Sequence, residues 1–205
     1  IKRIRFLEWG TKRCPNELSR PTFPQLYTNE KLLINALGEM KAAIDLNKEF
    51  YCEQQVRMAV LWNDLKGISN KSIDSSVRKF SKLKRSEMEN LSKTIDLRCL
   101  LGILNSKYTS ILLSDIRGGD YHIVPEHIRN IPIPNVGNEQ HAAIVALVNH
   151  ILTAKRDDPN VDTTAEEQEI DRMVYHLYGL TYDEVKIVDP ETPLKKEEYE
   201  DFETK

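Results

Sequence analysis

The sequence has few cysteines, lacks long apolar runs and does not begin with methionine, and each absence narrows what the chain can be. Cys14, Cys52 and Cys99 lie far apart and form no Cys-x-x-Cys pair, so neither a disulfide framework nor a zinc site is indicated. This usage favours a reducing cytoplasm. No apolar run approaches the roughly 20 residues that a membrane span requires, and no signal peptide is recognisable, so we expect no membrane partner. Because the chain opens on Ile1 in a basic segment, we expect a fragment of a longer protein.

The composition is typical of a globular protein, but the charged residues are distributed unevenly along the chain. A length of 205 residues, with 40 % hydrophobic and 30 % charged side chains, suffices for one sizeable domain or a domain with an appendage. The net charge is -3, but residues 157–205 carry 16 Asp and Glu against 5 Lys and Arg. Residues 1–156 therefore carry 24 Lys and Arg against 16 Asp and Glu. A basic body with an acidic end suits a polyanionic partner that is bound by the body alone.

Three segments in the first third of the chain predict a small mixed or antiparallel sheet. Lys31 to Leu37 is a short, nearly continuous apolar run, and Met40 to Asp45 can return beside it as the second arm of a hairpin. Asp45 to Lys48 has the Asp and Asn content of a turn. Between residues 50 and 62, apolar side chains fall mainly on even positions and polar ones on odd positions, which is typical of a strand with one buried face.

A long helix is predicted after Thr94 or Asp96, either of which can cap it. Its apolar residues recur at steps of three and four and form one stripe, namely Leu97, Leu100, Leu101, Leu104, Tyr108, Ile111 and Leu112. Arg117-Gly118-Gly119-Asp120 ends the helix, because glycine tolerates the left-handed conformation that redirects a chain. The prolines up to Pro134 then favour extended backbone. Since the stripe has to be buried, we expect the helix to pack with the sheet in an α+β fold.

The C-terminal third predicts a helical hairpin with a short third helix. Two apolar stripes form the hairpin, the first at Ile144, Leu147, Val148 and Ile151 and the second at Ile170, Met173, Val174, Leu177 and Tyr178. Capping boxes at Thr164 with Glu167 and at Thr181 with Glu184 mark helix starts, and Gly179 lies where a C-terminal cap belongs. Residues 190–205 are acidic and have few apolar side chains, so we expect an unstructured tail.

Three phrases resemble the C-terminal part of adenine-specific DNA methyltransferases of type IIG-like restriction-modification systems. They are LLGILNS at residues 100–106, IPIP at 131–134 and IDRMVYHLYGLTYDE at 170–184. In that family a TaqI-like specificity domain, also called a target recognition domain, reads the DNA site. The resemblance covers roughly residues 20–188. It implies a connector over 1–19, a target recognition domain over 20–137, a C-terminal helical subdomain over 138–189 and an acidic tail over 190–205.

The resemblance also implies that the methyl-transfer chemistry lies outside this chain. A methyltransferase of this kind needs an Asn/Asp-Pro-Pro-aromatic motif for the target amine and a glycine-containing turn for S-adenosylmethionine, and neither occurs here. We therefore expect a parent DNA adenine methyltransferase or type II restriction enzyme whose upstream catalytic domain binds S-adenosylmethionine. This chain would supply no catalytic residue and no metal site. It would bind double-stranded DNA and place a target adenine for flipping into that domain.

The candidate DNA contacts are basic residues in polar or glycine-rich segments. Residues 63–93 have too few apolar side chains to form a core, and they carry Lys71, Arg78, Lys79, Lys82, Lys84 and Arg85. Lysine and arginine neutralise phosphates, and arginine can also pair with guanine. Arg117 is a further candidate because it adjoins the glycine turn, and so is His122. The structural alternative is a solvated helix face or loop for residues 63–93, and helix capping for Arg117.

Two other functions stay open from the residues alone. Asp45, Glu49 and Glu53 could suggest a metal-dependent nuclease, but no Glu-x-Lys follows at the required spacing, and solvated turn residues also explain them. His122 and His127 are five positions apart, which matches no helical face for a metal site. The second alternative is a protein-interaction module, for example from a specificity subunit, whose main surface is the helical C-terminal end.

Overall fold

The computed structural model describes residues 25–52, 55–79 and 82–202. Contacts among these residues group them into two compact units. Unit 1 comprises residues 25–33 and Ile44–Ile95, and unit 2 comprises Ile34–Ala43 and residues 96–202. The connector predicted for residues 1–19 lies outside the described residues. The boundary predicted after residue 137 concerns function and stays a prediction.

A three-stranded antiparallel sheet follows a short helix, α1 (Gln25–Thr28). Its strand order is β2-β1-β3, with β1 at Lys31–Asn35, β2 at Ala42–Asp45 and β3 at Val56–Ala59. The apolar run of β1 suits its central position, because Leu32 and Ile34 are both buried. The predicted α+β class, with a small sheet packed against helices, is confirmed. The alternating run from 50 to 62 forms a shorter strand than its pattern suggested.

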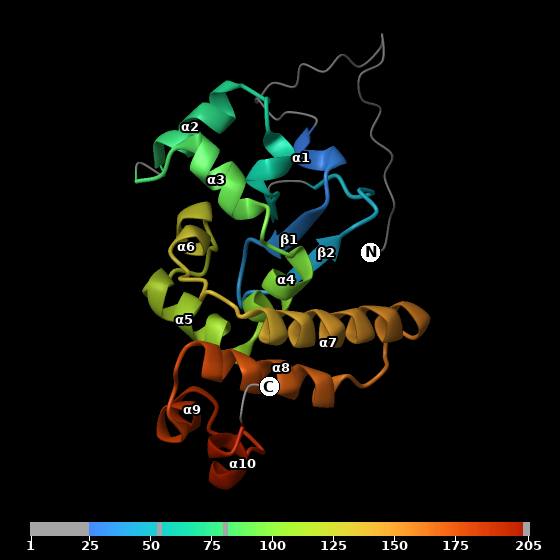
Figure 1. Cartoon of the computed structure of the whole chain (residues 1–205), viewed down its shortest axis with the longest axis vertical. Helices are drawn as coiled ribbons and strands as arrows, with labels where there is room; N and C mark the ends of the chain where they lie inside the picture. Colours follow the sequence, from blue (N-terminus) through green and yellow to red (C-terminus); the bar gives the residue numbers. More distant parts are fainter. Residues whose placement is uncertain (1–24, 53–54, 80–81, 203–205) are drawn as a thin grey trace. The chain divides into compact units, whose positions relative to one another are not determined.

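The polar stretch after β3 folds into short helices of unit 1 (Figure 1). They are the 3-10 helix η1 (Trp62–Leu65), α2 (Lys71–Lys79) and α3 (Arg85–Ser92). The Oδ1 atom of Asn70 caps α2 by accepting from the backbone N–H groups of Ser72 and Ile73 at 2.9 and 3.0 Å. The hydroxyl of Ser92 accepts from the backbone N–H of Asn63 at 2.8 Å and so joins η1 to α3. Hydrogen bonds of polar side chains thus order a segment that has little apolar content.

The single long helix predicted from residue 96 is wrong, because the structure has two consecutive helices there. They are α4 (Leu97–Asn105) and α5 (Lys107–Arg117). Ser106 adopts extended backbone with ψ 152°, and its hydroxyl accepts from the backbone N–H of Thr109, so it ends one helix and caps the next. Asp96 caps α4, as predicted, by accepting from Arg98 N–H at 2.7 Å. Gly118 ends α5, as predicted, with φ 57° in the left-handed region.

The segment after the glycine turn is not extended throughout. A short helix, α6 (Pro125–Arg129), interrupts it, with Pro125 at the first helical position. Proline suits this position because its fixed φ is helical and its missing N–H would have no partner inside the helix. Pro132 and Pro134 lie outside any helix, as predicted.

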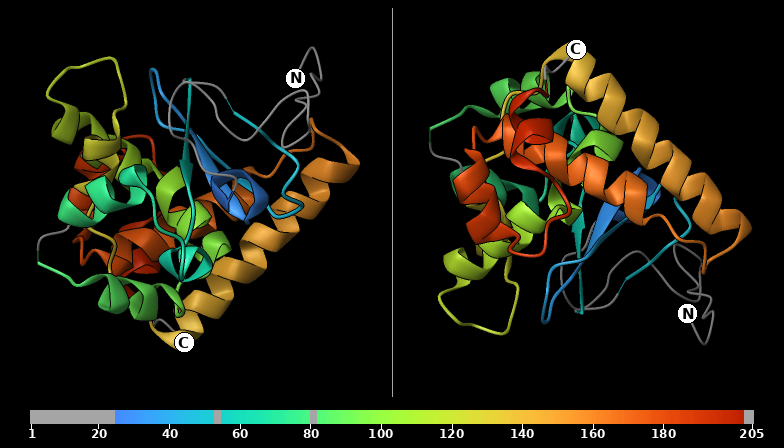
Figure 2. Two further views of the ribbon diagram at one scale, coloured as in Figure 1. Left: turned by 90° about the horizontal axis from the view of Figure 1, so that it is seen from above. Right: turned by 90° about the horizontal axis from the view of Figure 1, so that it is seen from below.

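The predicted helical hairpin and its short third helix are confirmed in unit 2. Helices α7 (Asn138–Asp157) and α8 (Thr164–Leu177) lie side by side, as Figure 1 and the right view of Figure 2 show, and α9 (Tyr182–Val188) follows. Gly102 of α4 lets α7 approach closely, since a Cβ atom there would lie 2.9 Å from Cγ2 of Ile144. The capping box at Thr181 is present. The cap of α8 lies one residue earlier than predicted, at Thr163, whose hydroxyl donates to Glu167 at 2.6 Å.

The acidic end contains a further short helix, α10 (Lys196–Glu200), so the prediction of an unstructured tail is wrong there. Tyr199 is buried, donates its hydroxyl proton to the carbonyl of Leu180 at 2.7 Å and stacks on His176 of α8 at 4.1 Å between ring centroids. A few aromatic contacts anchor this segment, and the low apolar content of the sequence hid them.

Within the described ranges, no helix combines the length and apolar content that crossing a bilayer demands.

Candidate nucleic-acid interface

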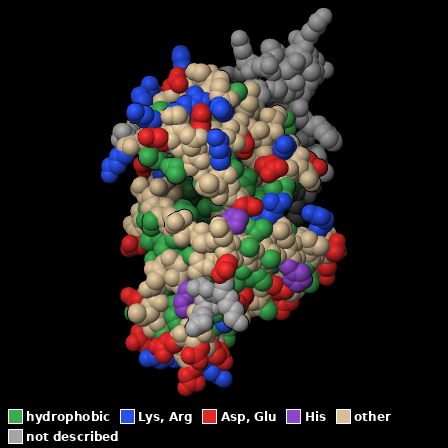
Figure 3. All heavy atoms as spheres, viewed as in Figure 1, with side chains coloured by type: hydrophobic (Ala, Val, Ile, Leu, Met, Phe, Trp, Pro, Cys, Tyr) green, Lys and Arg blue, Asp and Glu red, His purple; other side chains and the backbone are tan. Residues whose placement is uncertain are grey.

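Six of the eight predicted DNA contacts lie on or between two helices of unit 1. Lys71, Arg78 and Lys79 belong to α2, and Arg85 begins α3. Lys82 and Lys84 precede α3 directly in the chain. Figure 3 shows Lys and Arg side chains gathered over this part of the surface, whereas Asp and Glu side chains gather over α10.

Five of these residues form an exposed surface that we name the α2 basic surface: Lys71, Arg78, Lys79, Lys82 and Lys84. Among the residues that the structure describes, no salt bridge involves any of them. Asp74 is the one acid in the sequence between residues 71 and 85. The cations of this surface therefore stay available to phosphate oxygens, which is what backbone binding to DNA requires.

Arg85 has a structural role instead. Its Nε donates to Oε1 of Glu89 at 2.9 Å, and its Nη2 donates to the carbonyl oxygen of Leu65 at 2.8 Å. The guanidinium thus joins α3 to η1, and a DNA contact would have to replace these bonds. Sequence reasoning could not separate Arg85 from its neighbours, because the distinction depends on a carbonyl twenty residues earlier in the chain.

The other two candidates, Arg117 and His122, lie in unit 2. Nη1 of Arg117 donates to the carbonyl oxygen of Gly38 at 2.6 Å, so this side chain holds the turn after β1 rather than capping its own helix. His122 is exposed, and its ring Nδ1 lies 3.3 Å from Oδ1 of Asp120. The backbone N–H of His122 also donates to that carboxylate, which lowers the pKa of Asp120. A carboxylate beside His122 disfavours contact with a phosphate.

The three resembling phrases meet within unit 2 through direct hydrogen bonds. Oδ1 of Asp171, from the third phrase, accepts from the backbone N–H of Lys107, directly after the first phrase, at 2.8 Å. The hydroxyl of Tyr178, also from the third phrase, donates to the carbonyl of Pro132 in the second phrase at 2.7 Å. Nζ of Lys107 lies 2.8 Å from Oδ2 of Asp189. The phrases therefore hold one another in place.

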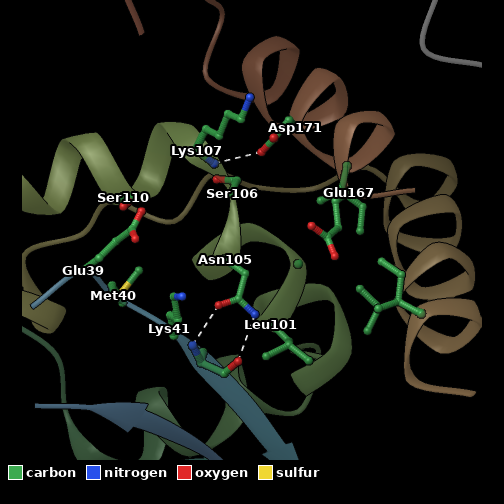
Figure 4. A pocket seen from close by; sticks show the side chains of 15 residues that line it. Glu39, Met40, Lys41, Leu101, Asn105, Ser106, Lys107, Ser110, Glu167 and Asp171 are labelled. Carbon is green, nitrogen blue, oxygen red and sulfur yellow. Dashed lines mark hydrogen bonds between the residues drawn. The ribbon is translucent and has the colours of Figure 1, made fainter. Parts of the chain in front are cut away.

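Asn105 of the first phrase binds the edge of the sheet. Its side chain accepts from the backbone N–H of Ala42 at 2.8 Å and donates to the carbonyl of the same residue at 3.0 Å (Figure 4). Both backbone groups of one residue of β2 are thus satisfied by a single amide. This pairing explains structurally why asparagine follows the apolar run of α4.

A pocket of about 400 Å³ lies where these contacts converge in unit 2 (Figure 4). Its polar wall includes Glu39, Lys41, Glu167 and Asp171, and its apolar wall comes from α4, α7 and α8. Burial raises the pKa of Asp171 to about 6, although the Lys107 N–H opposes this shift. Carboxylates outnumber ammonium groups in this wall, so the pocket is unsuited to a phosphate.

Sequence reasoning missed a buried ion pair in unit 1. Nζ of Lys31 lies 2.5 Å from Oδ2 of Asp45, and both side chains are almost completely buried. Burial raises the pKa of Asp45, but the hydrogen bonds from Lys31 and from the Phe50 and Glu49 N–H groups outweigh it, so the pKa is lowered. The sequence did offer a signal for this ion pair. Lys31 begins the predicted buried strand, and Asp45 ends the predicted returning arm of the hairpin.

This ion pair bears on the nuclease alternative. Because Lys31 and two backbone N–H groups occupy the Asp45 carboxylate, it is not open to a metal ion. Glu53, the third acid of that hypothesis, lies outside the described residues. In the part of the chain that the structure describes, no group of three or more His, Cys, Asp and Glu side chains could hold a metal ion.

Comparisons of the chain with protein families, curated proteins and solved structures return no match.

Proposed function

We propose that this chain is the target recognition part of a restriction-modification DNA adenine methyltransferase, which acts in the cytoplasm and can also carry a nuclease. It binds double-stranded DNA through the α2 basic surface and helps to place an adenine for flipping into an upstream catalytic domain. S-Adenosylmethionine belongs to that domain. The observation that carries the proposal is the set of exposed cations at Lys71, Arg78, Lys79, Lys82 and Lys84, none of which forms a salt bridge with another described residue.

The geometry of unit 2 supports a division of work within the chain. Residues of the three resembling phrases are engaged with one another and with the sheet edge, which gives these phrases a structural role. A scaffold of this kind positions neighbouring recognition segments, which can then differ between enzymes that read different sites. The DNA contacts in this account come from unit 1.

A salt titration of DNA binding tests the proposal. The chain should bind a duplex of mixed sequence with a Kd of roughly 10⁻⁴ to 10⁻⁶ M, the range of sequence-independent binding, and the affinity should fall steeply as salt rises. Fluorescence anisotropy of a labelled 24-base-pair duplex measures both. A chain that binds no duplex even at low ionic strength would contradict the proposal.

A segment exchange tests site recognition separately. Replacing residues 20–134 in the parent enzyme by those of a relative should change which sequence is methylated and preserve methyl transfer to adenine. Sequencing of methylated positions in genomic DNA measures this result. An unchanged site in an enzyme that still methylates would refute the assignment of this chain as the reader.

The protein-interaction alternative is favoured by one observation at the C-terminal end. Ile187 on α9 is 78 % exposed beside the acidic α10 region, and such a side chain can dock on a partner. Under this alternative, Ile187→Asp would abolish association with the partner subunit, and the chain would not bind DNA. Under our proposal, Ile187→Asp leaves the salt dependence of DNA binding unchanged.

A further inference from the structure

The loop after β2 in unit 1 is held in one conformation by a single carboxylate. Oδ1 of Asp45 accepts from the backbone N–H of Glu49 at 3.1 Å, and Oδ2 accepts from that of Phe50 at 3.0 Å. Lys48, between Asp45 and Glu49 in the chain, adopts φ 62°, a left-handed conformation that is unusual for a residue other than glycine. The surrounding hydrogen bonds must therefore fix this backbone.

The Asp45 carboxylate is itself held in place by Lys31. Lys31, which is 0 % exposed, contacts Asp45 and also donates from Nζ to the carbonyl oxygen of Tyr27 at 2.7 Å. A buried ion pair contributes little net stability compared with apolar residues of the same volume. Instead, the pair holds the end of α1 and the loop after β2 in fixed positions relative to each other.

That relation brings two tyrosine rings together. Tyr27 is buried, and Tyr51 stacks on it with ring centroids 5.0 Å apart and planes 14° from parallel. Tyr51 nevertheless remains 45 % exposed, and the adjacent Phe50 is 40 % exposed. The Tyr51 ring is thus held partly open to solvent by its stacking on Tyr27, and the backbone of the adjacent Phe50 is fixed by the buried Asp45 carboxylate. Fixed, exposed aromatic residues lose little conformational entropy when they bind a partner.

We infer that Tyr51, backed by Tyr27, is a stacking platform for a nucleobase that leaves the duplex stack, with Phe50 as a second apolar contact. The inference rests on the proposed function, because it takes DNA as the partner. Every base offers a π-face to an aromatic ring, so such a platform binds DNA without needing a particular sequence. The proposed function assigns the phosphate contacts to the α2 basic surface, which belongs to the same unit.

A base-stacking platform favours DNA in which unstacking is easy. The probes are a 24-base-pair duplex of mixed sequence and the same duplex with one central mismatch, whose bases unstack at lower cost. We expect the full chain to bind the mismatched duplex about 10-fold more tightly, the range of one stacked base. Tyr51→Ala should remove this preference and leave the salt slope unchanged. Tyr51→Phe keeps the ring and should retain the preference.

Controls separate this inference from the proposed function. Tyr121, which is 66 % exposed in unit 2, provides a matched aromatic change, and Tyr121→Ala should keep the preference for the mismatch. Arg78→Ala with Lys79→Ala should weaken binding to both duplexes equally. If Tyr51→Ala is unstable by circular dichroism, Tyr51→Leu keeps apolar volume without a ring.

The outcomes are distinct. A parent chain without preference for the mismatch, or a Tyr51→Ala variant that retains it, overturns the platform, and the proposed function stands as long as the basic variant loses binding. A parent chain that binds neither duplex overturns both. Loss of the preference in Tyr51→Ala and its retention in Tyr51→Phe and Tyr121→Ala support the platform.

Discussion

The charged side chains around Lys107 in unit 2 and those of the α2 basic surface in unit 1 are used in opposite ways. In unit 2, Asp171 binds the Lys107 backbone, and Asp189 binds the Lys107 ammonium group. In unit 1, the α2 basic surface has no salt-bridge partner among the described residues. Charged residues thus serve internal packing around Lys107, whereas the cations of the α2 basic surface remain available to an external partner.

The comparison shows why the three phrases are poor guides to the binding residues here. The phrases stand out because their residues have fixed partners within the chain, such as Asn105 with Ala42 and Tyr178 with Pro132. The cations of the α2 basic surface have no salt-bridge partner among the described residues, so no internal contact of that kind requires them. We expect changes in unit 2 to affect stability and changes on the α2 basic surface to affect DNA binding.

The largest expected effect is a cavity in unit 2. Leu104 is 4 % exposed, so Leu104→Ala should lower the free energy of unfolding by about 2 to 5 kcal/mol, the range for deleting a buried leucine side chain. Urea denaturation followed by circular dichroism measures this loss. The matched change in unit 1, Leu91→Ala, removes a leucine that is 57 % exposed and should cost less than about 1 kcal/mol. Equal losses would mean that Leu104 is not a core residue of unit 2.

A second change tests the internal role of an acid in unit 2. Burial raises the pKa of Asp171 from its ordinary 3.8 to about 6, so the folded chain binds the extra proton between these values. Stability should therefore fall as pH rises from about 4 to about 6. Asp171→Asn keeps an acceptor for the Lys107 N–H and removes the charge. The variant should be about 1 to 3 kcal/mol more stable than the parent at pH 7.5.

Denaturation midpoints at pH 4 and pH 7.5 check this expectation. The advantage of Asp171→Asn should shrink towards zero at pH 4, where the parent carboxyl is protonated in the folded chain. The same advantage at both pH values would mean that Asp171 is no more protonated in the folded chain than in the unfolded one. In that case the pocket wall would be better solvated than the geometry indicates.

Two helix caps of similar strength offer a finer comparison. The hydroxyl of Thr181 caps α9, and the side chain of Asn70 caps α2. Thr181→Ala and Asn70→Ala should each cost about 1 kcal/mol of stability. Only Asn70→Ala should also weaken DNA binding, because it loosens the helix that carries Arg78 and Lys79. If Thr181→Ala weakens binding as much, the division between the units fails.

Much of the fold could be predicted from local patterns. The sheet, the C-terminal hairpin and the caps at Asp96, Gly118 and Thr181 follow from apolar spacing and from the residue types that end helices. The break between α4 and α5 could not be predicted, because the apolar stripe continues across Ser106. Its cause is the serine hydroxyl, together with the distant Asp171 that accepts from the next N–H.

The candidate site was predictable in part. Composition located the α2 basic surface, since a polar segment with many cations has few structural uses for them. The roles of Arg85 and Arg117 were not predictable, because each donates to a backbone carbonyl that is remote in sequence. The stacked pair of Tyr27 and Tyr51 also depends on a contact between residues 24 positions apart, which no local pattern encodes.

The smallest expected effect on stability accompanies the central test. Arg78→Ala, Lys79→Ala and Lys82→Ala together should change the free energy of unfolding by less than about 0.5 kcal/mol, because all three side chains are exposed. The control variant changes Arg156, Lys195 and Lys196 to alanine. These three are exposed residues of unit 2, so the control makes the same change in net charge.

The most direct measurement is the slope of log Kd against log salt concentration for the parent and both triple variants on one duplex. The α2 variant should bind more weakly, with a slope flattened by about 3, or roughly one phosphate contact per residue removed. The control variant should match the parent in slope. Equal slopes for the parent and the α2 variant, or equal losses in the two variants, would contradict the assignment of the α2 basic surface as the DNA interface.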